Sequence, residues 1–128
     1  ALRLRPAVLP APNRLRERSD FTSAVRSFGG CRAGSRLLVV HATSTGARAG
    51  LPPRVGFVVS KAVGGSVVRN RTKRRLRALV AQRLSSIPDG VDLVVRANPP
   101  AAQATSRELA KALDPLVQRV VTGLGGTA

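Results

Sequence analysis

The stretch from Lys61 to Leu84, KAVGGSVVRNRTKRRLRALVAQRL, holds eight of the chain's 22 basic residues and predicts one helix with two different faces. Its apolar positions recur at the spacing of a helix that packs on a core; they are Val68, Thr72, Leu76, Leu79 and Val80. A second set falls on a single arc opposite this stripe, and it consists of Asn70, Lys73, Arg74 and Arg77. We therefore expect one face to be buried and the other to be strongly cationic.

The charge pattern of this helix indicates the kind of partner that its cationic face binds. A merely solubilising face, which is the alternative, mixes acids with bases because like charges one turn apart repel. Here no acid accompanies the bases, and five arginines outnumber one lysine between Arg69 and Arg77. A guanidinium group binds phosphate through two hydrogen bonds and stacks on bases. Asn70 adds an amide that can contact a base edge or a ribose hydroxyl. We interpret the face as an RNA-binding surface.

These residues resemble a known motif. Gly65, Val67 and Val68, followed by Arg69-Asn70-x-x-Lys73-Arg74-x-x-Arg77 and preceded by Lys61 after an apolar strand, resemble the RNR motif of the protein subunit of bacterial ribonuclease P. Upstream, Asn13-Arg14-Leu15 and then Asp20-Phe21 are similar to the amino-terminal segment of that family, so the resemblance runs from Leu9 to Val121. Three positions depart from the family's usual residues without removing a phosphate-binding group; they are Ser66, Thr72 and Ala78.

The resemblance implies two RNA-binding surfaces. The first is the basic helix, whose expected RNA-binding residues are Lys61, Arg69, Asn70, Arg71, Lys73, Arg74, Arg75 and Arg77. The second is a cleft between the first helix and the sheet, where the family binds the single-stranded 5′ leader of precursor tRNA. Its expected residues are Phe21, Val25 and Phe57. Because Val25 stands where a second aromatic residue is often found, we expect a more aliphatic cleft with weaker stacking.

Catalysis is not expected from the protein itself. Its six acids form no obvious cluster for a two-metal site, and His41, the one histidine, is interpreted as a strand residue rather than a metal ligand. On the resemblance, the chain is an enzyme subunit only within a ribonucleoprotein. The expected partners are ribonuclease P RNA and precursor tRNA, with no obligate protein partner, and magnesium is held mainly by the catalytic RNA and the substrate.

Two other functions use the same basic helix. A small structural RNA-binding protein of the ribosomal type would need the cationic face, but a leader cleft built around Phe21 would serve no purpose in it. A DNA-binding protein is disfavoured because no second helix and tight turn complete a helix-turn-helix motif.

Composition sets the limits of the fold. The chain has 128 residues, which fits a single domain, and its net charge of +16 with a pI of about 12.0 favours a polyanionic partner. No apolar run approaches the roughly 20 residues that a membrane-spanning helix needs. The single cysteine, Cys31, fits a reducing compartment, so we expect a cytoplasmic protein with no membrane contact. We expect a flexible basic arm over 1–18, a folded core over 19–122 and a flexible tail over 123–128.

The element order follows from periodicity and turn residues. A first helix is expected from a cap at Ser19 to Phe28, and strands are expected at 36–42, 54–60 and 91–95. A last helix starts at the capping box Thr105 to Glu108 and continues past Pro115 with a kink. The fold class is α+β, a small mixed sheet packed with helices in the order α-β-β(-β)-α-β-α. The strand–helix–strand unit is of parallel type, and the resemblance implies a left-handed crossover, although base rates favour a right-handed one.

Overall fold

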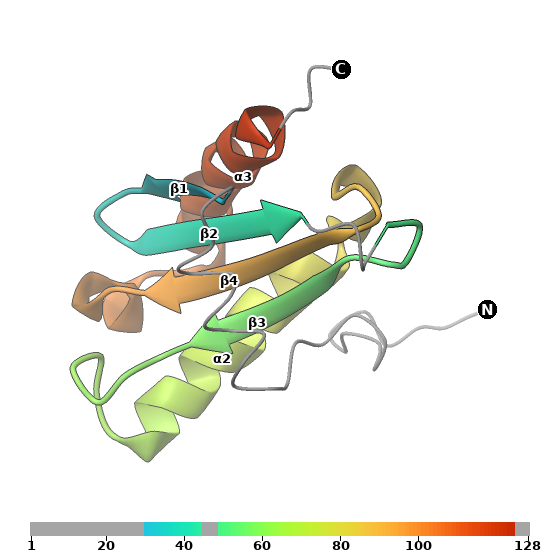
Figure 1. Ribbon diagram of the computed structural model, residues 1–128. Helices are drawn as coiled ribbons and strands as arrows, with labels where there is room; N and C mark the ends of the chain where they lie inside the picture. The colour runs from blue at the N-terminus through green and yellow to red at the C-terminus, as the bar shows by residue number, and fades with distance from the viewer. Residues whose placement is uncertain (1–29, 45–48, 125–128) are drawn as a thin grey trace.

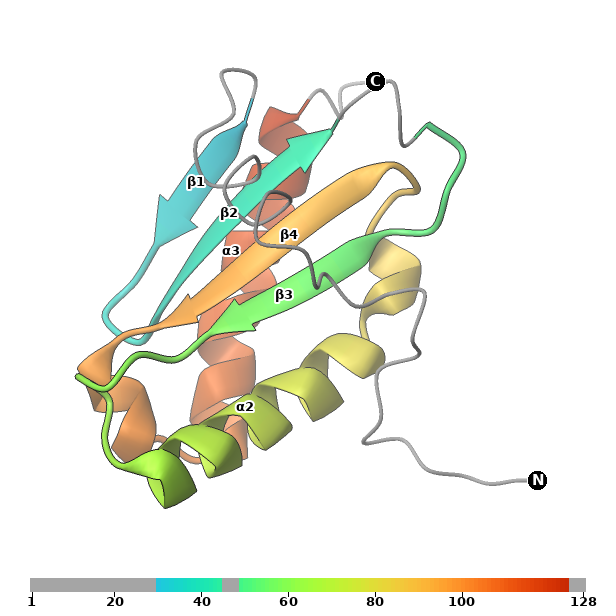
Figure 2. The same cartoon turned by 60° about the horizontal axis from the view of Figure 1, so that its bottom comes forward.

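A computed structural model describes residues 30–44 and 49–124 and shows one four-stranded sheet with two long helices on the same side (Figures 1 and 2). The first predicted helix lies outside the described residues. The strands are β1 (Cys31–Gly34), β2 (Leu38–Ser44), β3 (Arg54–Val58) and β4 (Val91–Ala97). The helices are α2 (Ser66–Ala81) and α3 (Ser106–Gly123), with short 3-10 helices η3 (Leu84–Ser86) and η4 (Pro99–Gln103).

The sheet is mixed, as predicted. Its strand order is β1-β2-β4-β3, and β1 and β4 pair with β2 in antiparallel fashion. β3 pairs with β4 in parallel, so β3, α2 and β4 form the expected parallel unit. The handedness of this crossover stays a prediction.

The strand bounds differ from the prediction by a few residues. The strand expected at 36–42 begins only at Leu38, because two hydrogen bonds between Ser35 and Leu38 close a turn before it. The Ser35 nitrogen donates to the Leu38 oxygen at 2.8 Å, and the Leu38 nitrogen donates to the Ser35 hydroxyl at 3.3 Å. Arg36 and Leu37 therefore lie in the turn rather than in the strand.

The hydrophobic core lies between the sheet and the two helices. Val40 pairs with Val95, and Val95 pairs with Phe57, so all three side chains lie on the helix-covered side of the sheet. The largest side chains buried in this core are Leu38, Leu76, Leu93, Leu109, Leu113 and Leu116. The intervening residues of β2 and β4 face the opposite side; His41 and Val94 are buried there, whereas Arg96 is exposed.

Helix α2 shows the expected two faces but is shorter than the predicted stretch. Its buried residues are Thr72, Leu76, Leu79 and Val80, with Val68 partly buried. A turn at residues 61–63 and Gly64, whose φ of 157° suits glycine, precede the helix. The cap residue is Gly65, which has no side chain to bond the free N–H groups, and no acid lies in the first turn. Packing, rather than capping, therefore stabilises this helix.

Helix α3 begins with the predicted capping box. The Thr105 hydroxyl accepts a bond from the Glu108 backbone nitrogen at 3.1 Å, and the Glu108 carboxylate accepts one from the Thr105 nitrogen at 2.9 Å. The helix continues past Pro115, as expected, to Gly123. Its buried stripe is Leu109, Leu113, Leu116, Val117 and Val120.

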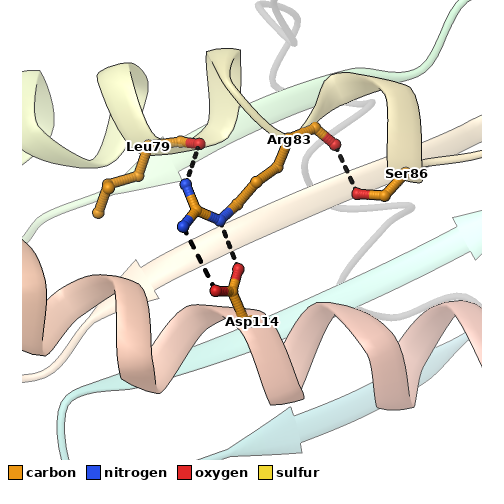
Figure 3. A network of polar contacts seen from close by, with 4 residues as sticks. All are labelled: Leu79, Arg83, Ser86 and Asp114. Atoms are coloured by element: carbon orange, nitrogen blue, oxygen red, sulfur yellow. Dashed lines mark hydrogen bonds and ion pairs between the residues drawn. The ribbon is translucent and has the colours of Figure 1, made fainter.

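One polar network joins the end of α2 to α3 (Figure 3). The Arg83 guanidinium forms an ion pair with Asp114 of α3 and donates a hydrogen bond to the Leu79 carbonyl at 2.9 Å. The Arg83 carbonyl in turn accepts a bond from the Ser86 hydroxyl at 2.7 Å. This cation is thus committed to the junction between the two helices.

Candidate nucleic-acid interface

The exposed face of α2 contains a hollow lined by the four residues predicted to form its cationic arc. This basic hollow has a volume of about 320 Å³ and is lined by Asn70, Lys73, Arg74 and Arg77. Lys73 is partly buried and the other three residues are exposed. None of the four makes a side-chain hydrogen bond or ion pair with another described residue. Three positive charges therefore lie together without an internal counter-ion.

The remaining arginines of α2 are held by backbone carbonyls. Arg69 donates to the Gly64 oxygen at 3.1 Å, which closes the turn before the helix. Arg71 donates to Ala102 at 3.4 Å, and Arg75 donates to Ala104 at 2.8 Å. The last two bonds attach α2 to η4 and to the residue that follows it.

These contacts divide the residues predicted to bind RNA into two groups. Arg69, Arg71 and Arg75 each bond a backbone carbonyl within the fold. The side chains that line the basic hollow make no such bond to another described residue. A guanidinium carries five N–H donors, so one bond to a carbonyl leaves others for phosphate. Lys61 is exposed in the turn before α2. RNA binding by these four cations stays a prediction.

Most acids of the described segments are used elsewhere. Asp92 accepts two bonds from Arg54, at 2.9 and 2.8 Å, and Asp114 pairs with Arg83. The pKa of Glu108 is held below its ordinary value, chiefly by the hydrogen bond from the Thr105 backbone. Three of the four described carboxylates are thus engaged in structural contacts, Asp89 is exposed in the turn before β4, and none of the four lines the basic hollow.

The predicted leader cleft is described only in part. Phe21 and Val25 lie outside the described residues, so their arrangement stays a prediction. Phe57 is partly buried in β3 and packs against the core beneath the helices. This position indicates a packing role, and a leader contact could use only the exposed part of the ring.

Three basic residues from different strands gather on the opposite side of the sheet. His41 lies in β2, as expected, and pairs with Arg32 of β1, while Arg96 extends from the same side of β4. Burial first, and then the charges of Arg32 and Arg96, lower the pKa of His41. The imidazole is therefore neutral at pH 7. Cross-strand register, which the sequence does not reveal, brings these three residues together.

The described ranges contain neither a metal-binding cluster nor a membrane-spanning helix. Residues 30–44 and 49–124 contain no group of three or more His, Cys, Asp or Glu that could hold a metal ion. Neither of the long helices described, α2 or α3, is apolar and long enough to span a membrane.

Comparison with known proteins decides between the candidate functions. The family model described as Ribonuclease P matches residues 9–121. The chain belongs to this family. It is 52% identical over 122 residues to the ribonuclease P protein component of Streptomyces bikiniensis, covering 91% of this chain and 98% of that protein. It is 56% identical over 107 residues to that of Beutenbergia cavernae, covering 84% and 87%.

Solved ribonuclease P proteins have the same fold. The Staphylococcus aureus protein matches with a TM-score of 0.72 at 26% identity, covering 85% of this chain and 97% of that one. The Thermotoga maritima protein matches with a TM-score of 0.71 at 26% identity, covering 84% and 96%. As a ribonuclease P protein, the chain is a subunit of a ribonucleoprotein endonuclease of tRNA processing. The ribosomal-type alternative is thereby set aside.

Proposed function

We propose that the basic hollow of α2 binds the catalytic RNA of ribonuclease P, while a separate surface around Phe21 binds the 5′ leader of precursor tRNA. The observation that supports the first part is the hollow itself. Lys73, Arg74 and Arg77 share one exposed face and lack internal partners among the described residues. A polyphosphate chain supplies the counter-charge that this face lacks.

Some arginines of α2 bond to the rest of the fold while others remain available for RNA, and this arrangement supports an RNA-binding helix that is held in a fixed position. Because Arg71 and Arg75 are bonded to the carbonyls of Ala102 and Ala104, α2 is held in one position against η4. The basic hollow is thereby presented to RNA from a helix whose other face is buried. Little ordering of the helix backbone is required on binding, which favours affinity.

The protein's role in catalysis is to bind and position RNA. Cleavage of the phosphodiester that joins leader to tRNA uses magnesium, which we place mainly on the catalytic RNA and the substrate. Among the described residues, Asp92, Asp114 and Glu108 are engaged in structural contacts and Asp89 lies apart from them, so these carboxylates form no cluster that would hold magnesium on the protein. We place the protein in the cytoplasm and propose no obligate protein partner.

A reconstitution assay tests this function. Precursor tRNA is incubated with a bacterial ribonuclease P RNA at low magnesium, with and without the protein, and release of the 5′ leader is measured. We expect the protein to restore cleavage and Arg74→Ala to reduce this effect. Arg119→Ala, which removes the same charge from an exposed position of α3, is the matched control and should behave as the wild type. Folded protein that restores no cleavage would refute the proposal.

A further inference from the structure

One residue of the basic hollow differs chemically from the other three. Lys73, Arg74 and Arg77 can only donate hydrogen bonds, whereas the amide of Asn70 can also accept them through its oxygen. Asn70 is exposed, and its side chain makes no hydrogen bond to another described residue. The hollow therefore offers a single free side-chain acceptor amid donors.

We infer that Asn70 recognises the ribose 2′-hydroxyl of a nucleotide whose phosphate is bound by the cations of the basic hollow. This inference rests on the proposed function and adds a chemical basis for selecting RNA. A 2′-hydroxyl that donates a hydrogen bond needs an acceptor, and neither lysine nor arginine can provide one. The carboxylates that could serve instead do not line the hollow.

The spacing along α2 suits one nucleotide. Asn70 precedes Lys73 and Arg74 by three and four residues, so these side chains are neighbours on the helix surface. Cβ atoms at this spacing are about 5–6 Å apart. A phosphate bound by Lys73 and Arg74 therefore leaves the attached sugar within reach of the Asn70 amide.

Such a contact meets a need created by the charge of the protein. At a net charge of +16, the chain attracts any polyanion, and phosphate contacts alone do not distinguish RNA from DNA. The 2′-hydroxyl is the group that lets a protein make this distinction at a given site. Asn70 is thus assigned as a specificity-determining residue of the interface.

The experiment uses the full chain and three labelled hairpins of identical sequence, made of RNA, of 2′-fluoro RNA and of DNA. The 2′-fluoro hairpin keeps the A-form shape but has no 2′ hydrogen to donate, so it separates hydrogen bonding from helix shape. Affinities are measured for the wild type, Asn70→Ala and Arg74→Ala. Thermal melts of both variants check folding, and neither should melt earlier, because alanine favours helix at an exposed position.

We expect the wild type to bind RNA about two- to tenfold more tightly than 2′-fluoro RNA, which is the effect of one hydrogen bond. Asn70→Ala should lose this preference by weakening only on RNA. Arg74→Ala should weaken on all three hairpins and keep the preference.

Two outcomes would overturn the inference: a wild type that binds RNA and 2′-fluoro RNA equally, or an Asn70→Ala variant that keeps the wild-type preference for RNA. If Arg74→Ala still weakens on every hairpin in that case, the proposed RNA-binding face stands and only the role of Asn70 fails. If Arg74→Ala weakens on none of them, the proposed function itself fails.

Discussion

Two adjacent arginines of α2 should respond in opposite ways to the same substitution. Arg74 is exposed and has no partner among the described side chains, whereas Arg75 is partly buried and donates to the Ala104 carbonyl at 2.8 Å. A hydrogen bond from a charged group contributes about 1.5–3 kcal/mol, and partial exposure places Arg75 near the lower end. Arg75→Ala should therefore lower the free energy of unfolding by about 1–2 kcal/mol. Arg74→Ala should leave it nearly unchanged.

The effect on RNA binding should be the reverse. Each phosphate contact contributes roughly 0.7–0.9 to the slope of log affinity against log salt. Arg74→Ala should reduce the slope by about that amount, while Arg75→Ala should change it less. Urea unfolding measures the first quantity, and filter binding to ribonuclease P RNA over a salt series measures the second. An equal loss of slope in both variants, together with an unchanged free energy of unfolding for Arg75→Ala, would refute this reasoning. Arg75 would then bind RNA as Arg74 does, and its bond to the carbonyl would not stabilise the fold.

Three further predictions concern the core, the leader and pH. Leu76→Ala should cost about 2–5 kcal/mol of stability in urea unfolding, because the side chain is fully buried, and RNA affinity should change little once the variant is folded. Phe21→Ala should lower holoenzyme affinity for precursor tRNA but not for mature tRNA, whereas equal losses with an earlier melt would indicate a plain core residue. Stability should fall as pH drops below about 6.5, because the unfolded state binds a proton that burial, Arg32 and Arg96 keep off His41 in the folded state. Melts of His41→Gln should show a weaker dependence in that pH range.

Periodicity was enough to predict both faces of α2, and local sequence signals predicted the start of α3 and its continuation past Pro115. The apolar positions that periodicity selected in α2 include Leu76, which is fully buried, and the capping box at Thr105 has the predicted bonds. These features depend on local spacing, which the sequence contains directly. The mixed sheet with parallel β3 and β4 is also confirmed.

What the sequence did not reveal depends on contacts between distant segments. The hydrogen bonds from Arg71 and Arg75 to backbone carbonyls join residues that are 31 and 29 positions apart. Helical periodicity cannot indicate which carbonyl lies within reach of each side chain. The optional strand of the predicted order was assigned no residues, and β1 was not predicted at its position because its four residues carry no continuous apolar run. The group of Arg32, His41 and Arg96 likewise depends on strand register.

The glycine cap of α2 has a consequence for the engineering of this protein. Gly65 has a φ of −71°, which any residue adopts, and a Cβ atom there would meet nothing within 4 Å. Serine could therefore bond the free N–H groups and add a few tenths of a kcal/mol. Aspartate would cap at least as well and would also complement the helix dipole, but it would bring a negative charge to the helix that binds polyphosphate. Selection for stability and selection for RNA affinity thus oppose one another at Gly65, and only a neutral cap improves the first without a loss in the second.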